Sequence, residues 1–431
     1  MTTSSRLAAP WRQCLRRWRQ VRSLWRVHGG RGLAEHARGA LARRIAPAQD
    51  WPPVSTGDLL AADLSHPFEW PRQPWPADGR LVINWVTTPP AIGSGGHATL
   101  FRIVNLLGER GHLNRLYLHD VYCGDLDYQA EIVRRHYGFH GPVARVQDGL
   151  QDAHAVFATA WPTAYPVFNA RCAGKRFYFV QDFEPSFHPV GARAVLAENT
   201  YRMGFHGITA GRWLAARLRA DYGMAADAFE FGCDVDRYVR DPGVARRGVA
   251  FYARPETARR GTELGLLALE VFARRRPDVE IHLFGGKVGA TRLRCIDHGP
   301  LSPQALNALY NRCYAGLSLS LTNVSLVPHE MLAAGCIPVV NDAAHNRMVL
   351  DNPHVAYAPL DPHALAARLE EIVGASDFEA RSQAAARSVH SVRWDQAGAT
   401  VEAVLRRTLG GAAAPLTETE RPRDASMASA A

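Results

Sequence analysis

Residues Ser318–Asn341 read SLSLTNVSLVPHEMLAAGCIPVVN, and this segment predicts the class of fold. Alternate leucines up to Leu321 indicate a short strand. A helix is expected to begin at Pro328, because proline is pre-set for the first turn of a helix. Gly335 ends that helix, and the apolar run Ile337–Val340 predicts the next buried strand. Strand, helix and strand in this order are typical of a parallel sheet covered by helices.

The start of the predicted helix is also a possible ligand site. Its unpaired N–H groups carry partial positive charge and would hold an anion. Glu330 lies just inside the helix, and its carboxylate offers two acceptor oxygens to sugar-like hydroxyls. Alternatively, the segment is an ordinary strand, helix and strand in which Glu330 only stabilises the helix dipole.

The composition is that of a globular protein with an unevenly distributed charge. The 431 residues are 47% hydrophobic and 21% charged, and they are enough for two domains. The formal net charge is +9, and residues 1–50 account for all of it, with eleven arginines against Glu35 and Asp50. Because the remaining chain is neutral, we expect no nucleic-acid partner.

The basic N-terminal arm, residues 1–50, alternates arginine with apolar side chains. Trp11, Leu15, Trp18 and Trp25 recur at nearly helical spacing, a pattern typical of helices that lie on anionic membranes. A disordered or domain-covering tail fits the composition equally well, and a transit peptide is a further alternative.

Features of a spanning or secreted protein are not expected. No run approaches the roughly 18 apolar residues that a membrane span needs, and arginines interrupt every early apolar run. The seven cysteines are odd in number and scattered, without a CxxC pair. We therefore expect buried thiols and a cytoplasmic protein, and the membrane alternative for the arm would make it peripheral on the inner face of the plasma membrane.

Five regions follow from the pattern along the chain. The arm is followed by a Pro/Trp-rich extended linker over residues 51–79 and by a tail over residues 411–431 that is disordered by composition. Residues 80–240 and 241–410 each alternate strands with helices, which predicts two doubly wound domains. Ligands bind such sheets at the carboxyl ends of the strands, so a cleft between the domains is the expected active site.

In the first domain, the pattern predicts four strands, at Leu81–Val86, Leu113–Leu118, Ala155–Ala158 and Arg176–Val180. It predicts helices near Leu100–Leu107, Tyr128–His136, Val190–Met203 and Gly211–Tyr222. In the second domain, the pattern predicts strands at Gly248–Tyr252, Glu280–Phe284, Ala315–Leu319 and Ile337–Val340. It predicts helices at Thr262–Arg275, Pro303–Cys313, Pro328–Ala334, Pro362–Val373, Phe378–Val389 and Ala397–Leu409.

A glycine-rich loop follows the first predicted strand. Gly95 and Gly96 leave backbone N–H groups free to point at a ligand, and His97 comes directly after them. The glycine spacing is not that of the dinucleotide-binding GxGxxG motif, which disfavours NAD binding. Tight strand–helix packing is the alternative reason for these glycines, and helix capping is the alternative role for His97.

Two other strand ends carry charged side chains. Residues 251–260 read FYARPETARR, and two guanidinium groups a short loop apart can clamp a diphosphate. A solvated arginine cluster is the alternative. Asp182 and Glu184 follow a strand of the first domain. Asp182 would orient an acceptor hydroxyl there, or both carboxylates are exposed loop charges.

These motifs resemble those of GT-B glycosyltransferases of family 4, over roughly residues 80–404. Segment 318–341 resembles the family's Glu-x7-Glu donor motif, with Glu330 as its second Glu and Thr322 in place of the first. In residues 251–260 and in the missing first Glu, the chain is similar to the bacterial rhamnosyltransferases of this family, which build surface polysaccharides. The resemblance implies a GT-B fold, a nucleoside-diphosphate sugar donor and retention of configuration.

The resemblance also implies a set of site residues. At the reaction centre we expect Arg254, Arg259, Glu330 and Asp182. For donor binding we expect Arg260, Lys287, His298, Thr322, Ser325, Leu326 and Val327, and for the acceptor-side loop Gly95, Gly96 and His97. No metal or other cofactor is implied, and Asp234-Val235-Asp236 has metal-site spacing but lies in the turn between the domains.

The function expected from the resemblance is transfer of a sugar, with rhamnose as the leading candidate, to a growing surface polysaccharide or lipid-linked glycan. Two other classes remain open. A GT-B epimerase would require carboxylates and histidines around the sugar, and a non-catalytic GT-B partner protein would bind other components without transferring sugar.

Overall fold

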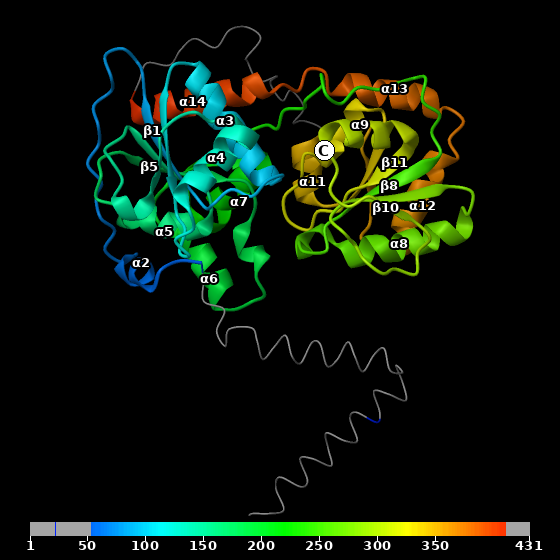
Figure 1. Ribbon diagram of the computed structural model, residues 1–431, viewed down its shortest axis with the longest axis horizontal. Helices are drawn as coiled ribbons and strands as arrows, with labels where there is room; N and C mark the ends of the chain where they lie inside the picture. The colour runs from blue at the N-terminus through cyan, green and yellow to red at the C-terminus, as the bar shows by residue number, and fades with distance from the viewer. Residues whose placement is uncertain (1–21, 23–52, 411–431) are drawn as a thin grey trace, which may run out of the picture. The chain divides into compact units, whose positions relative to one another are not determined.

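The computed structural model describes Arg22 and residues 53–410 of the chain. These residues form a seven-stranded sheet with the order β3-β2-β1-β4-β5-β6-β7 and a six-stranded sheet with the order β10-β9-β8-β11-β12-β13 (Figure 1). The N-terminal arm and the tail after residue 410 lie outside the described residues, apart from Arg22.

The first half, residues 53–240, contains the larger sheet. Its strands are β1 Val82–Thr87, β2 Leu113–Leu118, β3 Val143–Arg145, β4 Ala155–Ala158, β5 Lys175–Val180, β6 His206–Ala210 and β7 Ala226–Phe229. Its helices are α2 Thr56–Ala61, α3 Gly95–Glu109, α4 Leu126–Tyr137, α5 Trp161–Asn169, α6 Ala192–Asn199 and α7 Arg212–Tyr222, with single turns η1 Val146–Asp148, η2 Glu184–Phe187 and η3 Thr200–Arg202.

The second half, residues 241–410, contains the smaller sheet. Its strands are β8 Gly248–Ala253, β9 Glu280–Gly285, β10 Ile296–Asp297, β11 Cys313–Leu317, β12 Ile337–Asn341 and β13 Ala356–Ala358. Its helices are α8 Thr262–Arg275, α9 Pro303–Arg312, α10 Val327–Ala333, α11 Ala344–Leu350, α12 Pro362–Val373, α13 Phe378–Ser388 and α14 Trp394–Leu409, with the turn η4 Ala258–Arg260.

Both sheets are parallel and doubly wound, as the sequence predicts. Every described strand pair is parallel, from β1 with β2 to β12 with β13. Strand order reverses beside β1 in the first sheet and beside β8 in the second. Ligands bind at such reversal points, outside the carboxyl ends of the strands.

Alternate residues of the strands bury both faces of the first sheet. Trp85 and Phe157 stack at 4.0 Å between ring centroids and belong to the core cluster that includes α3. Val86 and Val156, one position along the same strands, belong to a second cluster with α5 and α7. Burial on both faces explains why these strands read as continuous apolar runs.

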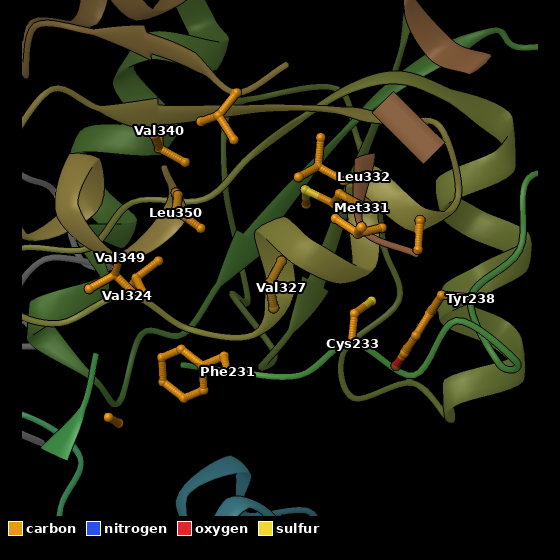
Figure 2. Packing of buried hydrophobic residues seen from close by; sticks show 14 of the residues in the cluster. Phe231, Cys233, Tyr238, Val324, Val327, Met331, Leu332, Val340, Val349 and Leu350 are labelled. Atoms are coloured by element: carbon orange, nitrogen blue, oxygen red, sulfur yellow. The ribbon is translucent and has the colours of Figure 1, made fainter. Parts of the chain in front are cut away.

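In the second half, α8 and α12 lie side by side on one face of the sheet, and α9 lies on the other (Figure 1). The short helix α10 contacts α9 and α13. Phe231 and Cys233 of the segment that connects the halves contact His329 of α10, and Figure 2 shows both in the hydrophobic cluster that includes Val327. The connecting segment therefore belongs to the same core as the helix that carries Glu330.

Several elements differ from the prediction. The strand expected over Ala315–Leu319 ends at Leu317, because the backbone of Ser320 is bonded to a side chain instead of a neighbouring strand. The helix expected over Val190–Met203 is α6 followed by the turn η3. Strands β3, β6, β7, β10 and β13 and helices α2, α5 and α11 were not predicted. Helix α5 is buried at every residue except its last, Asn169, and contains Pro166, so it lacks an amphipathic pattern.

The final described helix, α14, packs on the first half although its sequence follows the second. Gly398 brings α14 close to α3, since a Cβ at this glycine would lie 2.9 Å from the Cβ of Leu106. Val401 and Leu405 are fully buried in the core cluster. A division of the chain at residue 240 therefore does not separate two independently packed halves.

The predicted linker also packs on the first half. The indole of Trp70 donates to the carbonyl of Phe168 at 3.1 Å, and the segment contains the unpredicted helix α2. Among the described residues, no helix has the length and apolarity needed to cross a membrane. The six described cysteines are free thiols, and Cys123 is exposed, unlike the buried thiols that were expected.

Candidate functional site

The loop between β11 and α10, residues 318–326, is the centre of the site. Asn341, at the end of β12, holds this loop through both of its amide atoms. Its Oδ1 accepts from the backbone N–H of Ser320 at 2.9 Å, and its Nδ2 donates to the carbonyl of Ser320 at 2.8 Å. Nε2 of His345 donates to the same carbonyl at 2.7 Å. The loop is thus held from the carboxyl end of the neighbouring strand.

Loop 318–326 and the first turn of α10 contain buried polar atoms that have no hydrogen-bond partner. These atoms are Ser318 Oγ, Thr322 Oγ1, Asn323 Oδ1, Ser325 Oγ and His329 Nδ1. Elsewhere in the described part of the chain such atoms are scattered singly. Buried polar groups are almost always satisfied, so a concentration of unsatisfied ones calls for a partner. A ligand rich in hydroxyls would supply it.

An ion pair joins the two halves beside this loop. Arg259 of η4 donates from Nε to Oδ2 of Asp182, which follows β5, at 3.0 Å. Oδ1 of the same carboxylate accepts from the backbone N–H of Asn323 at 2.8 Å. The guanidinium also lies over the ring of Phe187, 3.9 Å from its centroid. Asp182 and Arg259, both expected at the reaction centre, are therefore in direct contact.

The two neighbouring arginines are placed differently. Arg260 is enclosed by the loop, where it donates to the hydroxyl of Ser320 and, at 3.1 Å, to the carbonyl of Asn323. Burial lowers the pKa of Arg260. Arg254 follows β8 and pairs with Glu256. Arg259 and Arg260 are thus half-buried and bonded to protein groups, and only Arg254, beside the exposed Glu256, fits the alternative of a solvated arginine cluster.

Glu330 is bonded to two tyrosine side chains. The hydroxyl of Tyr310 donates to its Oε2 at 3.3 Å, and Tyr238 bonds to the same carboxyl. Burial raises the pKa of Glu330 to about 7, and the nearby Asp234 adds to the rise. In the described structure, Arg254 and Glu330 have no hydrogen-bond partner in common.

The other predicted donor residues fall into two groups. Thr322 and Ser325 belong to loop 318–326, whereas Leu326 and Val327 contribute side chains to the hydrophobic core. Only the backbone of these two apolar residues is suited to a polar ligand. Figure 2 shows Val327 within that core.

Lys287 and His298 lie at the edge of the second sheet, beside β10. The amine of Lys287 donates to the carbonyl of Asp297 at 3.0 Å. The ring of His298 stacks on His282, and Nε2 of His298 lies 3.1 Å from Nδ1 of His282. No described contact joins either residue to the arginines, and their role in donor binding stays a prediction.

The glycine loop reaches the same site from the first half. Gln181 donates from Nε2 to the carbonyl of Gly96 at 3.0 Å, next to Asp182 in the chain. Ser94, not His97, caps α3, since its hydroxyl accepts from the His97 backbone at 3.4 Å. The His97 ring contacts the same hydroxyl, and burial lowers its pKa. Gly95 begins the helix and is exposed.

The alternative of exposed loop charges at Asp182 and Glu184 is wrong, because both residues are buried. Glu184 accepts from the backbone N–H of Trp161 at 2.6 Å and from the hydroxyl of Tyr178 at 3.2 Å. Burial raises the pKa of Glu184 to about 8. Glu184 therefore supports the loop behind Asp182.

The interdomain turn holds Asp234 in an ion pair instead of an open ligand position. Arg102 of α3 grips both oxygens of this carboxylate, with Nη2 donating at 2.7 Å. The described residues contain no group of three or more His, Cys, Asp or Glu side chains that could hold a metal ion.

Sequence reasoning missed three residues of the site. They are Asn323, Asn341 and His345, all of which bond to loop 318–326 or to residues beside it. Asn341 and His345 follow the apolar run of β12, and polar residues after a buried parallel strand signal a binding edge. The cross-domain contacts of Asn323 had no comparable signal.

The sequence is similar to one protein family and to one O-antigen biosynthesis protein. Residues 247–370 match the family described as WsaF, C-terminal domain. The chain is 33% identical over 359 residues to the O-antigen biosynthesis protein RfbC of Myxococcus xanthus. That alignment covers 79% of this chain and 28% of the relative, so the chain spans little more than a quarter of that protein.

Solved structures are similar over most of the chain. HepE of Anabaena, in complex with UDP-glucose, has a TM-score of 0.57 at 15% identity, covering 77% of this chain and 100% of that chain. A variant of S. aureus TarM, in complex with fondaparinux, alpha-GlcNAc-glycerol and UDP, has a TM-score of 0.61 at 7% identity, covering 75% and 99%. Together with the two parallel sheets, these likenesses show the GT-B fold that the sequence predicts.

Proposed function

We propose that this protein is a glycosyltransferase that moves a sugar from a nucleoside diphosphate to a growing surface polysaccharide or lipid-linked glycan. The concentration of unpartnered polar atoms in loop 318–326 carries the proposal. The loop lies beside Arg259 and Arg260, so hydroxyl-binding and diphosphate-binding groups occur together. Similarity to an O-antigen biosynthesis protein supports the polysaccharide product.

The arginines would bind the diphosphate. Negative charge on the leaving nucleoside diphosphate grows during transfer, so fixed cations stabilise the transition state more than the bound substrate. Arg254 is partly exposed and pairs with the exposed Glu256. Arg259 would exchange Asp182 for phosphate oxygens, because both are anionic acceptors for one guanidinium fork.

The sugar would meet the hydroxyls of loop 318–326. Thr322 offers a short hydroxyl where a carboxylate would reach further and bind more strongly. A 6-deoxy sugar such as rhamnose, carried on thymidine diphosphate, suits this weaker site. We propose transfer with retention, assisted by the leaving phosphate on the same face of the sugar and without a divalent metal, so activity should survive EDTA.

The acceptor would bind at the first half, near Gly96, His97 and Asp182. Gln181 links the glycine loop to the end of β5, and Asp182 would orient an acceptor hydroxyl once Arg259 releases it. The basic aromatic arm of residues 1–50 supports contact with a membrane that carries the acceptor. Sedimentation of the full chain with anionic and neutral vesicles tests that contact.

Calorimetric titration with UDP and dTDP, followed by transfer assays with UDP-glucose and dTDP-rhamnose, tests the proposal. We expect saturable nucleotide binding and transfer of labelled sugar to a lipid-linked glycan acceptor. Nucleotide binding without transfer or donor hydrolysis would favour a non-catalytic role. Absence of binding to any nucleoside diphosphate would overturn the proposal.

An epimerase is the second candidate, because a histidine and a carboxylate both bond to loop 318–326. His345 contacts loop 318–326, and Asp182 acts electrostatically on its ring. Incubation with the donor sugar alone, followed by NMR of the sugar, distinguishes the two activities. An inverted sugar carbon without an acceptor would show epimerisation.

A further inference from the structure

Asn323 belongs to the second half, but its side chain donates its hydrogen bonds to the first half. The residue is fully buried. Its Nδ2 donates to the carbonyl of Gln181 at 2.9 Å and to the carbonyl of Ala210 at 2.9 Å. These carbonyls follow β5 and end β6, so one amide group spans two neighbouring strand ends.

The orientation of this amide is determined by its partners. Both are carbonyl oxygens, which accept hydrogen bonds and cannot donate, so the NH₂ group must face them. Oδ1 then lies on the other side of the amide, where it is buried without a partner. Asn323 is therefore held by the first half while it keeps one acceptor atom unused.

The backbone of Asn323 ties the same residue to the arginines. Its N–H donates to Oδ1 of Asp182 at 2.8 Å, while Oδ2 of that carboxylate accepts from Arg259 at 3.0 Å. Its carbonyl accepts from Arg260 at 3.1 Å. A displacement of Asn323 must therefore disturb the environment of both guanidinium groups.

The unpartnered atoms of the loop are covered in this arrangement. Thr322 Oγ1, Asn323 Oδ1 and Ser325 Oγ are all shielded from solvent. Because these atoms are shielded, a nucleotide sugar can reach them only after the loop moves. The contacts of Asn323 with Asp182, Gln181 and Ala210 of the first half are among those that such a movement would break.

We infer that Asn323 is a positioning residue that couples the two halves to donor binding, an inference that rests on the proposed function for its ligand. Its bonds to the ends of β5 and β6 hold loop 318–326 and Arg259 in place while the halves are together. Their release admits the donor and frees Arg259 from Asp182. Their return sets the loop around the sugar, with Oδ1 as an additional acceptor for a sugar hydroxyl.

Distance measurements without ligand test the structural part. Spin labels would be placed at the exposed Tyr128 of α4 and Leu267 of α8, in a chain whose Cys14, Cys123 and Cys295 are replaced by serine. We expect one narrow distance distribution for Asn323 and a broader, longer one for Asn323→Ala.

Two further variants keep this measurement interpretable. Asn323→Asp preserves volume but sets a carboxylate against the carbonyls of Gln181 and Ala210, so we expect at least as much broadening. Asn114→Ala is the matched control, since Asn114 is also buried and bonds only within the first half, to Trp85 and Val104. An unchanged distribution in both Asn323 variants, or equal broadening in Asn114→Ala, would overturn the inference.

Kinetics with the nucleotide sugar test the functional part. We expect Asn323→Ala to lower kcat at least tenfold, because the loop is no longer set around the sugar, without weakening UDP binding, because the side-chain bonds that open to admit the donor are already absent. An unchanged kcat would overturn the donor role of Asn323. If the unmodified protein binds no nucleoside diphosphate, the proposed function fails, whereas the distance data still decide whether Asn323 holds the halves together.

Discussion

His112 and Glu402 lie 290 positions apart in the chain, and Nε2 of His112 is 3.2 Å from Oε1 of Glu402. The backbone N–H of Leu81 donates to Nδ1 of the same ring at 3.1 Å, so the ring proton is on Nε2 and points at the carboxylate. Arg406 donates to Glu402 at 2.7 Å. This network fastens α14 to the first half.

Because of this network, the free energy of unfolding should decrease at acid pH. The bond from His112, with Arg406, lowers the pKa of Glu402 from its usual 4.5 to about 2. A lowered folded-state pKa stabilises the fold fully above the unfolded value, and this contribution is lost as pH falls from 4.5 toward 2. We expect Glu402→Gln to cost on the order of 2 kcal/mol at neutral pH. In thermal unfolding from pH 3 to 7, the stability difference between the unmodified protein and Glu402→Gln should be smaller at pH 3 than at pH 7. A difference that stays constant across this range would contradict the assignment.

Arg259 is predicted to bind the donor diphosphate. Replacing it with alanine should weaken UDP binding by about tenfold or more, since a charge-assisted hydrogen bond contributes roughly 1.5–3 kcal/mol. Arg274→Ala is the control, because Arg274 is an exposed arginine that pairs only loosely with Glu270, at 3.9 Å. Calorimetry on both variants gives the comparison. Equal affinity in the two would leave Arg259 with a structural role alone.

Thr322 is predicted to limit the choice of donor sugar. Thr322→Glu adds a carboxylate acceptor in loop 318–326 and should raise kcat/KM for UDP-glucose relative to dTDP-rhamnose by about tenfold, from one additional charge-assisted bond. Thr322→Gln has the same length without the charge and should shift the ratio less. A ratio that moves equally in both variants would point to side-chain volume instead of charge.

Glu330 should give donor binding a pH dependence near neutrality. Burial raises its pKa to about 7, and only the ionised carboxylate offers both oxygens as acceptors to hydroxyls. Below that pKa, the affinity for UDP-glucose should fall by about tenfold per pH unit. Glu330→Gln should flatten the profile between pH 5.5 and 8. Calorimetry across this range checks both proteins, and a sloping profile in the variant would assign the titration to another group.

The sequence predicts best those elements whose own residues carry the pattern. Helix α8 was predicted with its observed bounds, Thr262–Arg275, because its apolar residues repeat with helical spacing. Strand β6 was missed because its five residues include Gly207 and a polar start at His206. Pattern recognition fails where burial on all sides or a glycine removes the periodicity.

The sequence likewise predicts some residues of the site and not their contacts. Arg259 and Asp182 follow buried strands or their loops, and the sequence pointed to both. That they bond to each other was not predictable, since it depends on how the two halves meet. Asn323 was missed for the same reason, because its partners Gln181 and Ala210 are more than a hundred residues away.

The return of α14 to the first half bears on how this protein can be divided. Cutting the chain near residue 240 would leave Val401 and Leu405, both fully buried, without the surface that covers them. The complementary fragment would lose the cover over Leu106, which approaches Gly398. We expect the separate fragments to aggregate and the co-expressed pair to reassemble, so any grafting of the second half onto a relative should carry α14 together with its partner surface on α3.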